Sequence, residues 1–301
     1  MPIKIQQGEV FAAHQDCVYA LCQGPEDHQF ISAGADGHII IWSLHNNEKA
    51  ILLSKCGQPV YSLLYIPEQH LLVAGQKDGG IHFIDLKNKQ VIRSVKTQHQ
   101  PIFDFIQLDA QKCISVNGDG SISVWDYHTF QCSLSLSISD KPLRAVALSP
   151  DAQHIAIGGS DAHIRIFHTE TMECIATLTD HTLSVFTLAF TPDGKQLIST
   201  GRDAQFRVWN MNQLPENNII PAHLYSVHHL AIHPNGRLMA SSAMDKTIKI
   251  WDLNTLQLLK VIDQTKFPSH TSSINRLLWM QEGKTLMSAS DDKKIMEWII
   301  V

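Results

Sequence analysis

The chain has 301 residues, of which 44% are hydrophobic and 18% charged, and this composition is typical of a soluble globular protein that can bury a large core. Its formal net charge of −5 argues against nucleic acid or an anionic membrane as the main partner, because both call for a basic surface. No long uncharged apolar run occurs, at the N-terminus or elsewhere, so we expect neither a signal peptide nor a membrane span.

The predicted elements recur in chain order with a period of about 42 residues. Each copy begins with an apolar strand such as Val185–Phe190, passes through a turn with proline or glycine such as residues 192–194, and enters a strand that ends in small residues. A tight turn with an aspartate follows, and then a further strand, as in Ser241–Asp252. These short β-branched runs between evenly spaced turns predict antiparallel β-structure, and no window carries the 3.6-residue apolar stripe of a helix.

Seven copies stand in register along the chain. They end near Trp42, Ile84, Trp125, Phe167, Trp209, Trp251 and Trp298. Six residues before each of these positions stands an aspartate: Asp36, Asp78, Asp119, Asp161, Asp203, Asp245 and Asp292. Four strands per copy, repeated seven times, need a closed radial arrangement that hides the sheet edges. The sequence therefore predicts an all-β, seven-bladed β-propeller with four antiparallel strands per blade, as a single domain over residues 1–301.

With this period and pairs such as Trp251-Asp252, the chain resembles the WD40-repeat family over essentially its whole length. The resemblance implies that an N-terminal strand completes the last blade; residues 2–11 are strand-like, and only residues 299–301 follow Trp298. It also implies a non-enzymatic scaffold that presents a rigid propeller face to protein or peptide partners. We expect such a chain to be a monomer within larger assemblies, without nucleic acid, membrane or cofactor.

Five copies combine His, Ser, Asp and Trp at fixed spacing, a set in which a Ser-His-Asp catalytic triad could be sought. The resemblance implies instead a buried hydrogen-bonded relay that locks each blade. Its members are His14, Ser32, Asp36 and Trp42; His99, Ser115, Asp119 and Trp125; His181, Ser199, Asp203 and Trp209; His223, Ser241, Asp245 and Trp251; and His270, Ser288, Asp292 and Trp298.

Two degenerate copies favour the structural interpretation. The second copy has Cys56, Ala74 and Ile84 at the His, Ser and Trp positions, and the fourth has Ser139, Ile157 and Phe167. A half-satisfied buried network is worse than none, so a structural relay should be lost as a unit, whereas a catalytic set would be kept in one copy. We therefore expect no catalytic residues. The aspartates of these two copies remain, which fits a carboxylate that bonds the N–H groups of its own turn.

Other chemistry has little support in the sequence. Phosphate-binding, dinucleotide-binding and zincin motifs are absent. His228, His229 and His233 form the densest histidine cluster, but neighbours on a strand point to opposite faces, so we expect no metal site. The six cysteines are scattered without a C-x-x-C pair, which favours free thiols in a reducing compartment and hence a cytoplasmic protein.

In this family the usual binding surface is the narrower face, which is fed by the loops between blades and by the aspartate turns. The residues that open each first strand or precede an aspartate, with an inserted loop before the last copy, predict a partner-binding rim: Tyr19, Tyr61, Lys77, Phe103, Arg144, Phe186, Arg202, His228, Met244, Lys266, Phe267 and Asn275. Aromatic rings with arginine are typical of interface anchors. Some of these rings could instead pack between blades.

The inserted loop lies around residues 264–268, where an exposed Phe267 would serve as a specificity element or reflect loop drift without a role. A different class of function stays open, namely an enzyme or small-molecule binder that uses the axial channel. That alternative requires two or more carboxylates or histidines that meet at the channel mouth. Asp291 and His228 are the only candidates on the rim.

Overall fold

The computed structural model describes residues 3–44, 50–96 and 100–300, and all structural statements below concern these residues. Within them the chain forms 28 β-strands and two short 3-10 helices, with no α-helix. The 3-10 helices are η1 (Pro67–Gln69), between the strands β6 and β7, and η2 (Gln281–Gly283), between β26 and β27. The chain is therefore all-β, as its short apolar runs predict.

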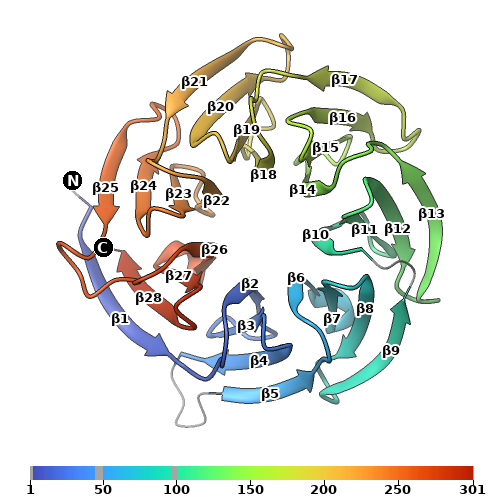
Figure 1. The fold of residues 1–301 in the computed structure, drawn as a ribbon, viewed down its shortest axis with the longest axis horizontal. Helices are drawn as coiled ribbons and strands as arrows, with labels where there is room; N and C mark the ends of the chain where they lie inside the picture. The colour runs from blue at the N-terminus through green and yellow to red at the C-terminus, as the bar shows by residue number, and fades with distance from the viewer. Residues whose placement is uncertain (1–2, 45–49, 97–99, 301) are drawn as a thin grey trace. The chain divides into compact units, whose positions relative to one another are not determined.

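The strands form seven four-stranded antiparallel sheets, which are the blades of a β-propeller (Figure 1). The first three blades are β2 (Val18–Gln23), β3 (Gln29–Gly34), β4 (His38–Ser43) and β5 (Ala50–Lys55); β6 (Val60–Ile66), β7 (Leu71–Gln76), β8 (Gly80–Asp85) and β9 (Gln90–Lys96); and β10 (Ile102–Gln107), β11 (Lys112–Asn117), β12 (Ser121–Asp126) and β13 (Gln131–Ser137).

The next three blades follow the same order of strands. They are β14 (Leu143–Leu148), β15 (His154–Gly159), β16 (Ile164–His168) and β17 (Cys174–Leu178); β18 (Val185–Phe190), β19 (Gln196–Gly201), β20 (Gln205–Asn210) and β21 (Asn217–Pro221); and β22 (Val227–Ile232), β23 (Leu238–Ala243), β24 (Ile248–Asp252) and β25 (Leu258–Ile262).

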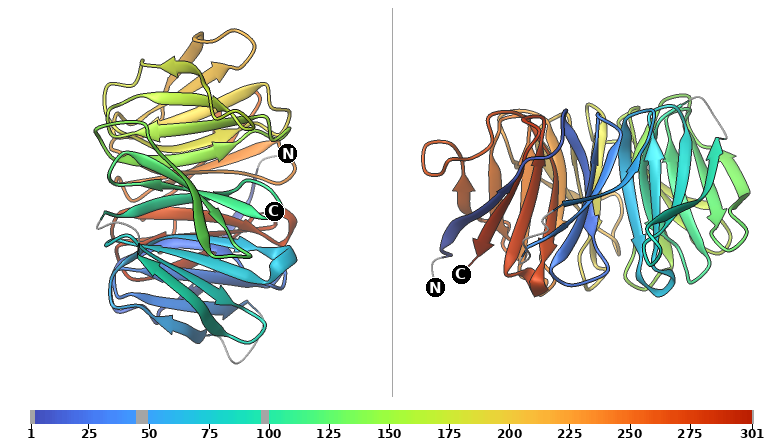
Figure 2. Two further views of the ribbon diagram at one scale, coloured as in Figure 1. Left: turned by 90° about the vertical axis from the view of Figure 1, so that its right-hand side faces the viewer. Right: turned by 90° about the horizontal axis from the view of Figure 1, so that it is seen from below.

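The seventh blade joins the two ends of the chain. Its strands are β26 (Ile274–Met280), β27 (Thr285–Ser290), β28 (Ile295–Ile300) and, as the fourth strand, β1 (Ile5–Phe11). β1 pairs antiparallel with β28 from Ile5 opposite Ile300 to Phe11 opposite Ile295, and Figure 2 shows the two strands side by side. This pairing closes the ring and confirms the predicted fold class, because it covers an edge that an open array would leave unpaired.

The described chain divides into two compact units. The first unit comprises Met1–Ala74, Ile84–Ile92 and His228–Val301, and the second comprises Gly75–Phe83 and Arg93–Val227. Each has buried apolar clusters of its own, such as Phe11, Phe30 and Trp42 in the first unit, and Leu197 and Trp209 in the second. That all seven repeats form a single domain stays a prediction.

The aspartate turns share an unusual backbone conformation. The residue after the aspartate has a positive φ in every copy: Gly37, Gly79, Gly120, Ala162, Ala204, Lys246 and Lys293. A side chain in this left-handed region costs about 1 kcal/mol relative to glycine. The aspartate offsets that cost, since its carboxylate accepts the N–H two residues on, as Asp36 does from His38 at 3.0 Å and Asp245 from Thr247 at 3.1 Å. The requirement for this bond explains an aspartate in all seven copies.

Ring closure through β1 yields a first testable prediction. Phe11 is buried in β1 and packs edge-on against Phe30 at 5.1 Å and Trp42 at 5.5 Å between ring centroids. We expect Phe11→Ala to lower the free energy of unfolding by about 3–5 kcal/mol in urea titrations, the usual cost of emptying a buried aromatic site. The neighbouring Val10 is exposed, so Val10→Ala should change it by less than about 0.5 kcal/mol. Equal effects of the two substitutions would show that β1 does not stabilise the closed ring.

Candidate functional site

The first copy of the predicted relay forms a continuous chain of hydrogen bonds. Trp42 Nε1 donates to Ser32 Oγ at 2.7 Å, and Ser32 Oγ lies 2.7 Å from His14 Nε2. The other ring nitrogen, His14 Nδ1, lies 3.0 Å from Asp36 Oδ2. Strands β3 and β4 position the serine and the tryptophan, whereas the histidine belongs to the loop before β2. The structure thus brings together four side chains from the loop before β2, the strands β3 and β4, and the turn between these strands.

The direction of these bonds follows from the donors. An indole nitrogen can only donate, so the Ser32 hydroxyl accepts from Trp42 and gives its own proton to His14 Nε2. His14 Nδ1–H then donates to Asp36, which requires a neutral imidazole. Burial lowers the pKa of His14, against the opposing attraction of Asp36, and so favours the neutral form.

The Asp36 carboxylate stays ionised in this arrangement. Burial by itself would raise its pKa, but the N–H groups of Gln15 and His38 and the His14 ring together hold the pKa below its ordinary value. Gln15 N donates at 2.8 Å, and this bond ties the loop after the relay histidine to the aspartate turn.

The relay has the same order of hydrogen-bond donors from serine to histidine to aspartate as a hydrolase triad, but its serine is buried. A nucleophilic serine must reach a substrate carbonyl beside an oxyanion site. Ser32 has no exposed surface, and the Trp42 N–H occupies an acceptor position on its oxygen. All five relay serines are fully buried: Ser32, Ser115, Ser199, Ser241 and Ser288. None of them can serve as a nucleophile without unfolding its blade.

Two further copies repeat the complete arrangement. In the fifth blade, the His181 ring lies 2.7 Å from Ser199 and 2.8 Å from Asp203, and Trp209 donates to Ser199 at 2.8 Å. In the seventh blade the corresponding distances among His270, Ser288, Asp292 and Trp298 are 2.8, 2.9 and 2.9 Å.

The third and sixth copies are described in part. Trp125 donates to Ser115 at 3.1 Å, and the Ser115 hydroxyl donates to Asn117 at 3.0 Å. Asp119 accepts from Ser121, while His99 lies outside the described residues. In the sixth copy, Trp251 donates to Ser241 at 2.9 Å and Asp245 accepts from Thr247. His223 is buried and belongs to the second unit.

In the two degenerate copies a cation pairs with the aspartate. Lys96 Nζ lies 2.8 Å from Asp78, and Arg165 Nη2 lies 2.7 Å from Asp161. Asp161 also accepts from the hydroxyl of Ser139 at 2.9 Å, at the position of the relay histidine. Burial would raise the pKa of Asp161, but Arg165 and Ser139 lower it. The turn's own N–H groups are therefore only part of what these two carboxylates bind.

The predicted rim residues at the start of the first strands occupy β-bulges. In β2 the register passes from Val18 opposite Gly34 to Ala20 opposite Ala33, which leaves Tyr19 as the extra residue. The register skips one rim residue in the same way in four other blades: Phe103, Arg144, Phe186 and Asn275. A bulge redirects the extra side chain out of the alternation of the strand. Each of these residues is half-buried.

The rim side chains of the first unit contact one another. Tyr19 and Tyr61 pack edge to face with ring centroids 5.2 Å apart. Asn275 Nδ2 donates to Asp291 at 2.7 Å, and its carbonyl oxygen lies 3.3 Å from His228 Nδ1. Asn275 thus separates the two titratable groups that the enzyme alternative requires at one place. Met244 and Lys266 are exposed.

In the second unit, the Arg144 guanidinium lies 4.0 Å from the centroid of the Phe103 ring and donates to Ser160 at 2.9 Å. Phe103 also packs against a buried cluster, so its ring is in part a packing element. Phe186 is half-buried, whereas Lys77 and Arg202 are exposed.

The expectation of an exposed Phe267 is corrected in part. The side chain is half-buried and its ring packs edge-on against Trp298, with the ring centroids 5.9 Å apart, beside the apolar cluster of the last blade. Its role in partner binding stays a prediction. The loop turns back because Phe267 N donates to Asp263 O at 3.1 Å, and Gln7 of β1 donates to Pro268 O at 3.2 Å. Phe267 therefore packs on the last blade, and the other inserted residues are exposed: Gln264, Thr265, Lys266 and Pro268.

The three clustered histidines have different partners. His228 lies near Ser273 and Asn275, and His229 Nδ1 accepts from Leu277 N at 3.2 Å. His233 Nδ1 accepts from Asn235 N, so its Nε2–H donates to Gly283 O at 3.1 Å. Among the described residues, no three His, Cys, Asp or Glu side chains gather closely enough to hold a metal ion. The six cysteines are free thiols.

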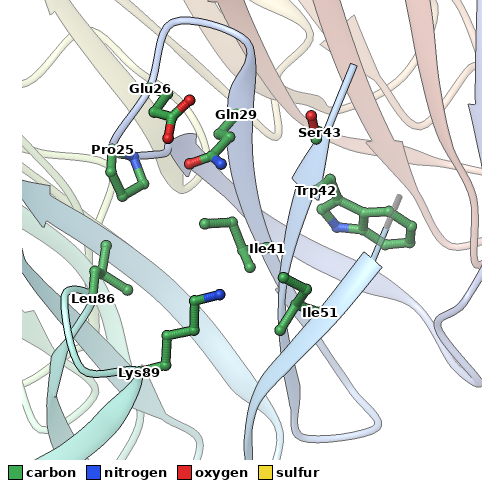
Figure 3. Close-up of a pocket in the computed structure, with 9 residues that line it drawn as sticks. All are labelled: Pro25, Glu26, Gln29, Ile41, Trp42, Ser43, Ile51, Leu86 and Lys89. Atoms are coloured by element: carbon green, nitrogen blue, oxygen red, sulfur yellow. The ribbon is translucent and has the colours of Figure 1, made fainter. Parts of the chain in front are cut away.

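A pocket lies in the first unit, between β3 and β4 on one side and the segment after β8 on the other (Figure 3). Its charged lining groups are Glu26 and Lys89, with Trp42 and Ser43 on its wall. The Ser43 hydroxyl is buried, and it has no hydrogen-bond partner among the residues that the structure describes.

Sequence reasoning missed one group of exposed apolar side chains in the second unit. Leu224 and Tyr225 are 84% and 60% exposed, and Leu183 is 45% exposed. They follow relay histidines by one or two positions. Comparison of the copies at these positions gives a signal, because the equivalent residues in the first and last copies are polar: Gln15, Asp16, Thr271 and Ser272.

One sequence-family model, described as "WD domain, G-beta repeat", matches five segments that together make up more than half of the chain: residues 6–43, 130–168, 172–210, 215–252 and 262–298. The copies that end at Ile84 and Trp125 lie outside the matched segments, although each forms a four-stranded sheet. No curated protein matches the chain. No helix among the described residues is long and apolar enough to cross a membrane.

The relay geometry leads to a prediction for the fifth blade. Ser199→Ala removes the acceptor of Trp209 and the partner of His181, and a buried polar group left unsatisfied costs about 1–3 kcal/mol. We expect a loss of that size in urea unfolding, against less than about 0.5 kcal/mol for Ser135→Ala on an exposed strand position. Ser199→Ala and Trp209→Phe should cost less together than the sum of the single changes, since they share one bond. Strict additivity would contradict the relay.

The half-buried His229 leads to a prediction for pH. Burial, with a smaller effect of Arg276, lowers the pKa of His229 well below its ordinary value. The unfolded chain therefore binds a proton as the pH falls below about 6.5, while the folded chain does not, and stability is lost in that direction. We expect His229→Gln, which still offers an acceptor to Leu277 N, to reduce this loss by up to about 1.4 kcal/mol per pH unit. Unfolding titrations between about pH 7 and pH 5 measure it, and an unchanged slope would assign the loss to other groups.

Proposed function

Because the chain belongs to the WD40-repeat family, we propose that it is a non-enzymatic scaffold that presents a propeller face to protein or peptide partners. The observation that supports this most directly is the series of β-bulges, which turn Tyr19, Phe103, Arg144, Phe186 and Asn275 out of their strands at the same position of five blades. A bulge costs pairing, and proteins retain one where it redirects a side chain.

The chemistry of the rim favours protein partners. In the second unit, Lys77 and Arg202 are exposed cations, and Arg144 is a half-buried one that stacks on Phe103. Arginine and aromatic side chains are the usual anchors of protein interfaces. The net charge of −5 disfavours the large phosphate surfaces of nucleic acid and membranes. We place the protein in the cytoplasm, as a monomer within larger assemblies.

The buried relays support the non-enzymatic proposal. The side-chain set with the proton order of a hydrolase is buried in each of the three blades where all of its hydrogen bonds are described, and its serine accepts a tryptophan N–H there. On the rim, Asn275 stands between His228 and Asp291 and bonds both. These groups then act as structural elements, and any catalytic output belongs to a protein that the scaffold binds.

Affinity capture with charge-reversed rim variants tests the proposal. We expect the double variant Lys77→Glu and Arg202→Glu to lose partners that the wild type retains, at least threefold by quantitative mass spectrometry, because both charges are exposed on the second unit's rim. The matched control is Lys195→Glu with Arg237→Glu, which reverses two exposed charges in turns at the opposite ends of their strands. Equal capture by the two double variants, with equal thermal stability, would overturn the role of the rim.

A further inference from the structure

Leu224 is the most exposed of the large hydrophobic side chains that the structure describes, and Tyr225 beside it is also exposed. They lie in the loop between β21 and β22, in the second unit. We call the surface formed by Leu183, Arg202, Leu224 and Tyr225 the Leu224 patch. An exposed apolar surface does not stabilise the fold, and where such side chains gather they mark interaction sites.

Backbone hydrogen bonds hold the three segments of the Leu224 patch together. Arg202 N donates to Ser184 O at 2.9 Å, which places the aspartate turn of the fifth blade beside the loop that carries Leu183. On the other side of the turn, Ala222 N and His223 N donate to Ala204 O at 3.1 and 3.2 Å, and Leu224 follows directly. The patch is therefore presented on a fixed backbone, which lowers the entropic cost of binding.

The relay anchors the same turn from below. Asp203, next to Arg202, accepts from His181 at 2.8 Å, so its carboxylate points into the blade and away from the patch. Arg202 forms no ion pair with any described residue. The patch thus presents one exposed cation together with three exposed apolar side chains.

We propose that the Leu224 patch binds a segment of a partner protein in which an apolar side chain stands next to an aspartate or glutamate. The inference rests on the proposed scaffold function and specifies one of its surfaces. The apolar side chain would pack on Leu224 and Tyr225, where a tyrosine supplies contact area with little loss of entropy. The carboxylate would accept both forked N–H groups of Arg202.

Charge favours an acidic, apolar peptide over two other occupants of the patch, a second copy of this chain and anionic lipid. In a twofold dimer through the patch, Arg202 of one copy would approach Arg202 of the other, which is unfavourable without an intervening anion. Anionic lipid would meet a chain of net charge −5 that has a single arginine at this place. An acidic, apolar peptide satisfies both features of the patch without such a penalty.

The test selects peptides from a random display library against the immobilised full chain, and then measures the affinity of the selected synthetic peptides by fluorescence polarisation. We expect enrichment of Asp or Glu beside Leu, Ile or Phe. Binding should weaken at least tenfold in Leu224→Ser with Tyr225→Ser, and similarly in Arg202→Glu. The matched apolar control is Leu258→Ser with Leu259→Ser, an exposed pair on β25, which should bind as the wild type does. The charge control is Lys195→Glu.

A double-mutant cycle tests whether the peptide's carboxylate pairs with Arg202. Replacement of the peptide's acidic residue by its amide should weaken binding to the wild type and to the Leu258→Ser, Leu259→Ser control, but cause no further loss in Arg202→Glu. An equal loss in Arg202→Glu would contradict the pairing with Arg202. Thermal melts of all variants establish that they fold.

The remaining outcomes separate this inference from the scaffold proposal. Selected peptides that bind the patch variants unchanged but lose affinity for Lys77→Glu would overturn the Leu224 patch and leave the scaffold intact. Enrichment of basic peptides would overturn the assigned chemistry. Light scattering tests a second copy as the occupant: self-association that Leu224→Ser with Tyr225→Ser abolishes would assign the patch to a dimer contact. Sedimentation with vesicles rich in phosphatidylserine tests lipid, and binding that the same double variant abolishes would assign the patch to a membrane surface. If no peptide is selected, the inference on the Leu224 patch fails, and affinity capture with the rim variants decides the scaffold proposal separately.

Discussion

Each intact blade depends on a serine hydroxyl that is completely removed from water. In the first blade, the Ser32 oxygen must both accept from Trp42 and donate to His14, and the His14 ring must pass its other proton to Asp36. Every group in such a buried chain needs its partner, because one missing bond leaves a desolvated polar atom. This constraint fixes the neutral form of the histidine and the charge of the aspartate. It also links β3, β4 and the loop before β2 to one another.

All seven copies retain the aspartate turn. The residue after the aspartate has a left-handed backbone, and the carboxylate accepts the N–H groups of this turn whether or not the relay is present. Where the histidine is absent, Lys96 and Arg165 pair with the carboxylates of Asp78 and Asp161. The two cations come from different positions of their blades, β9 and β16, so the compensation has no fixed spacing. The degenerate blades therefore have an ion pair in place of the relay, which is partly exposed for Lys96 and Asp78 and mostly buried for Arg165 and Asp161.

Features that repeat in register could be predicted from the sequence, and features that depend on a single contact could not. The period places Asp203 and Trp209 at fixed sites in a blade, and the strand-like N-terminus predicts the closure by β1. The burial of Phe267 depends on its contact with Trp298, which no spacing encodes. The bulge at Tyr19 has no sequence signal, because any residue can occupy it. Leu224 could have been found, since the equivalent positions in other copies are polar.

The same register explains how one rigid fold can carry different surfaces. The N–H of the residue after the relay histidine bonds the aspartate in two copies, from Gln15 at 2.8 Å and from Thr271 at 3.0 Å. That bond uses only the backbone, so the side chain there is not constrained by the relay. In the loop before β22 the backbone is held in a comparable way by Ala204 O, while Leu224 is exposed. Stability then depends on buried positions and recognition on the positions next to them. A change of partner requires no change in the blade.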